Sequence, residues 1–142
     1  MEKQFQLLLR LALSASYLSA VANRFGFWGA PETPGVAWGN WKNFVDYTAS
    51  VVVFLPEQWD GFLAIVATVL EVILPVLLIV GYQLKYVSIA SGLLLLGFAL
   101  AMTFSFGIKT PLDYSVFTGA AASFLLGRVE GGFGLAGFKR KV

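Results

Sequence analysis

The strongest constraint on the fold is a set of four apolar segments that carry almost no charge. They cover Phe5–Ala22, Phe62–Val80, Tyr86–Phe106 and Leu112–Leu126. About 20 helical residues, at about 1.5 Å rise each, cross the hydrocarbon core of a bilayer. The first three segments are close to that length. The fourth is shorter, and Pro111 before it suits the first turn of a helix. The pattern predicts an all-α integral membrane protein with four spans.

The composition supports this class of protein and narrows its chemistry. The chain of 142 residues is 58% hydrophobic and only 13% charged, whereas about a quarter of the residues in an average soluble domain are charged. The length fits a single domain, residues 1–142. Because the sequence has no cysteine and no histidine, it offers no disulfide, no thiol chemistry and none of the commonest metal ligands. No metal site and no nucleic-acid motif are predicted.

The longest connection, Asn23–Gly61, contains all four tryptophans of the chain. They are Trp28, Trp38, Trp41 and Trp59. Tryptophan gathers at the headgroup level of a membrane, so we expect this connection to form an interfacial cap between helices 1 and 2 of a four-helix bundle. Its part Asn43–Leu55 predicts a short helix that Pro56 ends, although the apolar run Val51–Phe54 also fits a strand.

The basic residues predict the orientation in the membrane. With four spans, seven of the ten Lys and Arg residues lie on the side of the two termini: Lys3, Arg10, Lys85, Arg128, Lys139, Arg140 and Lys141. The opposite side has Arg24, Lys42 and Lys109. The positive-inside rule then places both termini in the cytoplasm. An alternative takes the SAVA sequence before Asn23 as a signal-peptide cleavage site, but Arg10 interrupts the apolar core that such a peptide needs.

Glu71 is the most unusual residue of the apolar segments. It lies ten residues from both Gly61 and Gly81, and so near the middle of the second span, where an ionised side chain costs about 3 kcal/mol. Pro75 lacks the N–H that would bond to the Glu71 carbonyl, which leaves a second polar group at the same depth. We expect Arg10 of the first span to pair with Glu71, the alternative being that Arg10 reaches toward the headgroups. Glu71 then either ties helices together or serves a ligand or a proton.

A second polar group is expected at the outer face. The entrance to the fourth span and the end of the first contribute Lys109, Asp113 and Tyr114, and Asn23, Arg24 and Trp28. Cationic donors beside aromatic rings suit a quinone headgroup or a small anion, with Asp113 paired to Arg24 or Lys109. The alternative is an interfacial charge cluster that sets the depth of the helix ends. Ser16, Ser19 and Asn23 share one helix face, where a role in helix packing is favoured.

These motifs together resemble the DoxX family of small bacterial and archaeal membrane proteins. The resemblance rests on LLLRLALSASYLSAV with Arg10, on ANRFGFWG, on ATVLEVILPVLLIVG with Glu71, and on PLDYSVF with Asp113. It implies a four-helix protein of the cytoplasmic membrane. Family members have been tied to thiosulfate:quinone oxidoreductase and to membrane complexes that detoxify oxidants, and Arg10, Glu71 and Asp113 are the positions that the resemblance singles out.

Three functions remain as hypotheses. The leading one is a quinone-linked redox subunit, or a docking partner, of a membrane oxidoreductase system, with quinone as the candidate cofactor and a redox protein as the partner. The second is small-molecule or proton-coupled transport, because Glu71 and Pro75 resemble in their physics the broken-helix sites of transporters. The third is a non-catalytic membrane scaffold. The lipid bilayer is a partner in all three, and the sequence leaves catalysis and homo-oligomerisation open.

Overall fold

The computed structural model describes residues 2–129 and is helical, with no strand in that range. The basic residues Lys139, Arg140 and Lys141, on which the predicted orientation partly rests, lie outside the described residues. The elements are α1 (Glu2–Arg24), α2 (Trp41–Val51), η1 (Glu57–Trp59), α3 (Asp60–Val80), α4 (Leu84–Phe106), α5 (Lys109–Asp113) and α6 (Val116–Leu126).

Three of these helices are long and apolar enough to cross a membrane. The candidate spans among the described residues are Lys3–Arg24, Glu57–Val80 and Leu84–Phe106. Most side chains of these stretches point outward, and large apolar residues such as Phe5, Ile73 and Leu93 are exposed. Because water does not favour such surfaces, the exposure supports a bilayer as the surroundings of the chain.

The fourth apolar segment is not the single helix that the sequence predicts. The chain breaks between α5 and α6 at Tyr114 and Ser115, where Ser115 has a positive φ of 56°. The helix α6 has 11 residues and is about 16 Å long, which falls short of a bilayer core. Pro111 is buried and lies in the first turn of α5, the first of two short helices, which starts at Lys109.

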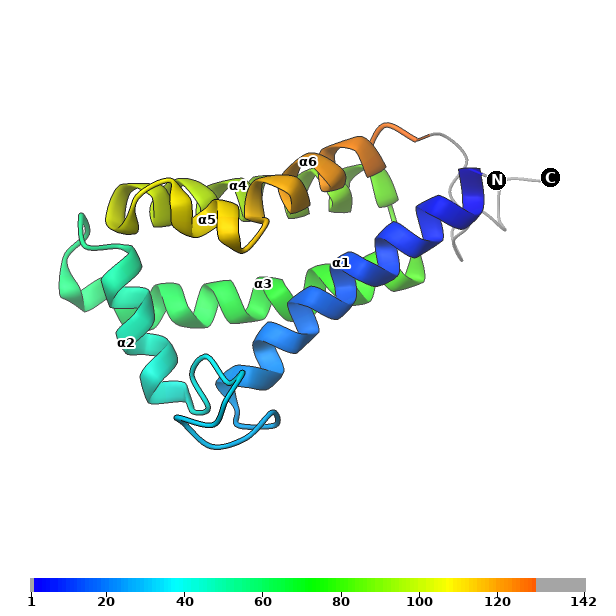
Figure 1. Ribbon diagram of the computed structural model, residues 1–142. Helices are drawn as coiled ribbons and strands as arrows, with labels where there is room; N and C mark the ends of the chain where they lie inside the picture. The colour runs from blue at the N-terminus through cyan, green and yellow to red at the C-terminus, as the bar shows by residue number, and fades with distance from the viewer. Residues whose placement is uncertain (1, 130–142) are drawn as a thin grey trace.

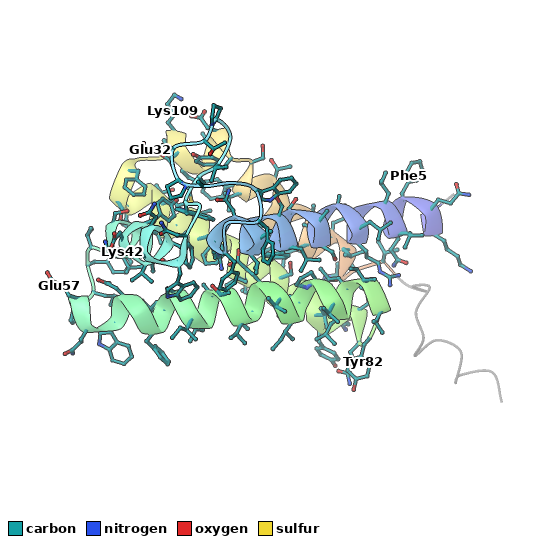
Figure 2. The ribbon with its side chains drawn as sticks, turned by 90° about the horizontal axis from the view of Figure 1, so that it is seen from below. Phe5, Glu32, Lys42, Glu57, Tyr82 and Lys109 are labelled. Atoms are coloured by element: carbon teal, nitrogen blue, oxygen red, sulfur yellow. The ribbon has the colours of Figure 1, made fainter. Side chains whose placement is uncertain are left out.

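The helices run back and forth between two ends of the molecule. The start of α1, the turn between α3 and α4 and the end of α6 lie at one end, and α2 and α5 lie at the other (Figure 1). In Figure 2, Phe5 and Tyr82 mark the first end, and Glu32, Lys42, Glu57 and Lys109 mark the second. We call these the α1-start end and the α2 end. Lys3 and Lys85 lie in the first turns of α1 and α4, and so belong to the α1-start end.

The contacts between α1 and α3 fix the register of the two helices. Arg10 of α1 donates from Nε to the Leu78 carbonyl (2.6 Å) and from Nη2 to the Ile79 carbonyl (2.7 Å). These carbonyls belong to the last turn of α3, where no N–H of the same helix follows to bond with them. Gly81 ends α3 in the left-handed conformation, with a φ of 74°. Arg10 therefore satisfies and neutralises the negative end of α3.

The connection between α1 and α3 folds back over the α2 end. Its helix α2 runs from Trp41 to Val51, and so begins and ends earlier than the predicted Asn43–Leu55. The Asn40 side chain caps the helix by accepting a hydrogen bond from the Asn43 N–H (2.8 Å). Of the Val51–Phe54 run, Val51 is the last residue of α2 and the rest follows as irregular chain and a turn, so the run is not a strand.

Candidate functional site

Glu71 is buried and forms an ion pair with Arg24. The expected pairing with Arg10 is wrong, because Arg10 is bound to the end of α3, about two helical turns away from Glu71. Arg24 belongs to the last turn of α1, and its side chain points back into the molecule rather than out to the headgroups. The charge of Glu71, in the middle of α3, is therefore neutralised from the C-terminal end of α1 and not from Arg10 in its first half.

Thr68 completes the polar contacts of the pair. It lies one turn before Glu71 on the same buried face of α3. Its hydroxyl accepts a hydrogen bond from Arg24 Nη1 (2.6 Å) and donates to the Ala64 carbonyl (2.8 Å). An apolar side chain of the same size could not accept this hydrogen bond from Arg24.

Aromatic rings of the connection cover the guanidinium of Arg24. The Cζ atom of Arg24 lies 3.8 Å from the ring centroid of Phe44 and 5.6 Å from that of Trp38. The two rings meet edge to face, with 4.9 Å between their centroids. A cation over aromatic faces is stabilised by their negative electrostatic surface, more so when water is excluded. We call Arg24, Thr68, Glu71, Phe44 and Trp38 the Arg24–Glu71 site.

Asn23 holds Trp38 over the site. Its side-chain carbonyl accepts hydrogen bonds from the N–H groups of Trp38 (3.0 Å) and Gly39 (3.2 Å), and Asn43 donates to the Trp38 carbonyl (2.9 Å). Gly39 has a φ of 70°, and a Cβ on it would lie 2.4 Å from the Pro31 nitrogen. The loop therefore needs glycine here, and Asn23 is a positioning residue rather than part of the predicted outer cluster.

One donor of the site has no partner. Among residues 2–129, nothing accepts a hydrogen bond from Arg24 Nε, although this atom is buried. A buried N–H without an acceptor costs about 1–3 kcal/mol, so such groups are rare in folded proteins and call for an explanation.

The predicted outer cluster does not assemble around Arg24. Lys109 pairs with Asp113 at the surface, four residues apart on α5, and both side chains are more than half exposed. Tyr114 is 72% exposed, and Trp28 is exposed with its Nε1 donating to the Ser19 carbonyl (3.1 Å). Asp113, Lys109, Tyr114 and Trp28 therefore stand apart from the Arg24–Glu71 site. Water screens the exposed pair, which adds little to stability.

Near the α2 end, a second aromatic group adjoins the site. The ring of Tyr47 on α2 lies 5.5 Å from Trp38 and 6.1 Å from Phe106, measured between centroids. Burial raises the pKa of the Tyr47 hydroxyl above its ordinary value, and the nearby Tyr114 raises it further. Tyr47 is therefore neutral at physiological pH and acts here as a packing ring.

The proposed serine stripe differs from the buried stripe that α1 shows. Ser16 and Ser19 are exposed, and the Ser16 hydroxyl donates to the Ala12 carbonyl of its own helix (3.0 Å). The buried hydroxyls of α1 are those of Ser14 and Tyr17. The sequence does contain a signal for their burial, because residues 10, 14, 17 and 24 are spaced so that they share one helix face.

Comparison with known proteins adds no relative from which a role could be taken. No protein-family model, no curated protein and no solved structure matches the chain. Among the described residues, no three His, Cys, Asp or Glu side chains gather in a group that could hold a metal ion. The Arg24–Glu71 site combines a buried cation, a buried carboxylate, a hydroxyl and two aromatic faces.

Proposed function

We propose that this chain is a DoxX-like protein of a bacterial or archaeal cytoplasmic membrane and binds a quinone as a subunit or docking partner of a redox system. In this proposal four segments cross the membrane as a bundle, with α5 and α6 together forming the fourth. The connection between α1 and α3 is an interfacial cap, and both termini are cytoplasmic. The observation that carries the proposal is the unpartnered, buried Arg24 Nε beside Phe44 and Trp38.

The chemistry of the Arg24–Glu71 site fits a quinone headgroup. A quinone carbonyl is an acceptor for the free N–H of Arg24, and its flat ring stacks on aromatic faces such as those of Phe44 and Trp38. Binding sites of small molecules commonly combine apolar walls with a few polar groups of this kind. Glu71 balances the charge of Arg24, so the site can accept an uncharged ligand without leaving a net charge in the membrane.

Access to this donor requires a movement of the cap. Phe44 and Trp38 belong to a segment that α1 holds through Asn23 and the Arg24 cation, and Asn43 of α2 donates to the Trp38 carbonyl within that segment. The cap is therefore the movable wall of the proposed site, while the cation and the carboxylate sit on the long helices α1 and α3. A redox partner protein that docks at the α2 end would meet this same wall.

The experiment measures quinone binding to the purified protein in lipid nanodiscs. A short-chain ubiquinone analogue is titrated in while tryptophan fluorescence is recorded, because a ring bound beside Trp38 quenches its emission. We expect saturable quenching in the wild type, and at least tenfold weaker binding in Arg24→Gln. Lys109→Gln is the matched control, since this cation lies at the same end but on the surface.

The result that would overturn the proposal is the absence of saturable quenching in the wild type, or equal affinity in Arg24→Gln and Lys109→Gln. The titration is repeated with a radiolabelled quinone, which reports binding without fluorescence. If Trp38→Phe loses the quenching but still binds the radiolabelled quinone, Trp38 is the residue whose emission is quenched. Circular dichroism of each variant shows whether Arg24→Gln is still helical.

A membrane scaffold is the second candidate, and one observation favours it. The Arg24–Glu71 site joins the end of α1, the middle of α3 and the start of α2 through a single cation. Such a junction can fix the shape of a surface that gathers partner proteins. In that case Glu71→Gln weakens assembly of the complex, and the quinone titration shows no binding in any variant.

A further inference from the structure

The buried face of α1 is polar along its whole length. Six described side chains of α1 are buried, and all but Leu13 are polar: Gln6, Arg10, Ser14, Tyr17 and Arg24. A helix in a membrane commonly turns polar groups inward, but it places them where they bond to neighbouring helices or line a functional path. The neighbours of this face decide between these two roles.

Neighbouring helices add hydroxyls at the depth of Tyr17. The Tyr17 hydroxyl lies 2.8 Å from Ser91 Oγ on α4, and Ser91 Oγ lies 3.1 Å from Ser123 Oγ on α6. All three side chains are buried. On the same buried face of α1, Tyr17 lies between Ser14, which contacts the Pro75 carbonyl of α3, and Arg24, which pairs with Glu71 of α3. Four helices therefore bring one polar group each to the centre of the molecule.

Toward the α1-start end, the same seam contains polar groups that lack partners. Ser88 lies one turn before Ser91 on α4 and is completely buried, and its hydroxyl has no partner among residues 2–129. The same holds for Nε2 of Gln6, near the start of α1. Between these two depths, the Ser14 hydroxyl donates to the Pro75 carbonyl (3.1 Å). Groups of this kind are the usual partners of buried water.

Toward the α2 end, the seam is closed. Beyond Glu71 lie the Arg24 guanidinium and then the rings of Phe44 and Trp38. A proton leaving Glu71 in this direction meets the aromatic cover, and the rings of Phe44 and Trp38 carry no hydroxyl that could pass it on. The other direction along the seam leads toward the end that Phe5 and Tyr82 mark in Figure 2.

We propose that Glu71 exchanges its proton with the aqueous face at the α1-start end, along the hydroxyls of Tyr17, Ser91, Ser123 and Ser88 and water bound between them. This inference rests on the proposed function, since the route supplies protons to Glu71, the carboxylate of the proposed quinone site. In each step an oxygen takes up a proton on one side and releases its own on the other, so the hydroxyls are unchanged and no electron moves.

The charges around Glu71 limit what the seam conducts. On α1, Arg24 pairs with Glu71, Tyr17 is buried on the same face about two turns before Arg24, and Arg10 lies about two turns closer to the α1-start end than Tyr17. At this depth α4 and α6 contribute the neutral hydroxyls of Ser91 and Ser123. The fixed charge of Arg10 disfavours a cation that rests in the seam. The route therefore exchanges single protons with a carboxylate rather than carrying a current.

The experiment follows protonation of Glu71 by infrared spectroscopy of proteoliposomes, with no quinone present. The carboxyl band is assigned by its absence in Glu71→Gln. Vesicles are prepared with the α1-start end outside or inside, and the external pH is lowered before and after addition of a protonophore. We expect the band to rise at once when the α1-start end is outside. When this end is inside, it should rise only after the protonophore is added.

Matched variants test the route. Tyr17→Phe and Ser91→Ala should each slow the rise of the band at least tenfold, whereas Tyr86→Phe and Ser16→Ala, which alter exposed side chains on the same two helices, should leave it unchanged. A prompt rise with the α1-start end inside overturns the inference, as do equal rates in Tyr17→Phe and Tyr86→Phe. A band that never changes on either side also overturns it, while quinone binding is judged by the separate fluorescence titration.

Discussion

Single side chains explain why a charged pair is tolerated inside this molecule. Arg24 distributes its donors between the Glu71 carboxylate and the Thr68 hydroxyl, and its flat face lies against Phe44. Breaking a buried pair by removing one partner typically costs about 3–5 kcal/mol, because the other charge stays buried without compensation. Each member of the site stabilises the buried charge of another. We therefore expect the loss of any one of these contacts to lower the free energy of unfolding.

Thr68→Val tests the smallest of these contacts. Valine keeps the shape of threonine but cannot accept a hydrogen bond from Arg24, so we expect a loss of about 1–2 kcal/mol in the free energy of unfolding. Thr103→Val is the control, because the Thr103 hydroxyl only bonds to the Ala99 carbonyl of its own helix (2.7 Å). Denaturation in mixed micelles compares the two, and equal losses would contradict the assigned role of Thr68.

At the scale of the helices, α4 and α6 approach each other closely at Gly92 of α4. A Cβ on Gly92 would lie 2.6 Å from the ring of Phe124, whereas a Cβ on Gly97 of the same helix would meet nothing within 4 Å. We expect Gly92→Ala to destabilise the protein by about 1–3 kcal/mol, since the Phe124 ring must shift. Gly97→Ala should be neutral or slightly stabilising. Thermal unfolding that does not separate the two variants would refute this packing.

The long helices were predictable because their signal is strong and local. The ranges Phe62–Val80 and Tyr86–Phe106 agree with α3 and α4 to within two residues at each end, since length and hydropathy alone define such helices. The break at Ser115 was missed, because a serine with positive φ has no reliable sequence signature. The partner of Glu71 was also missed. Arg24 was predicted to lie in the outer polar group as a possible partner of Asp113. Its contacts with Glu71 and Thr68 join parts of the chain that are more than 40 residues apart, and no local pattern indicates such a contact.

For the whole molecule, the arrangement of the helices predicts which residues share a side of the membrane. Because the chain contains no cysteine, single cysteines can be introduced at Lys3, Lys42, Lys85 and Lys109 and labelled with a reagent that does not cross the membrane. We expect Lys3→Cys and Lys85→Cys to react from one side, and Lys42→Cys and Lys109→Cys from the other. In intact cells, the charge distribution predicts that the first pair is protected.

Two outcomes of this labelling would contradict the arrangement. If Lys85→Cys and Lys109→Cys react from the same side, α4 does not cross the membrane. If Lys42→Cys is protected together with Lys3→Cys, the connection with α2 does not lie at the opposite face from the start of α1. Labelling of lysed cells, in which all four positions should react, shows that a protected position is blocked by the membrane and not by the fold.

Arg24, and not Arg10, compensates the charge of Glu71 in this structure. Two double-mutant cycles test it most directly, with the free energy of unfolding measured for Glu71→Gln combined with Arg24→Gln and with Arg10→Gln. The structure predicts a coupling of at least about 2 kcal/mol between Glu71 and Arg24, because the two charges are buried against each other. Between Glu71 and Arg10 it predicts losses that add to within about 0.5 kcal/mol. A strong coupling to Arg10 with additive losses for Arg24 would contradict this pairing.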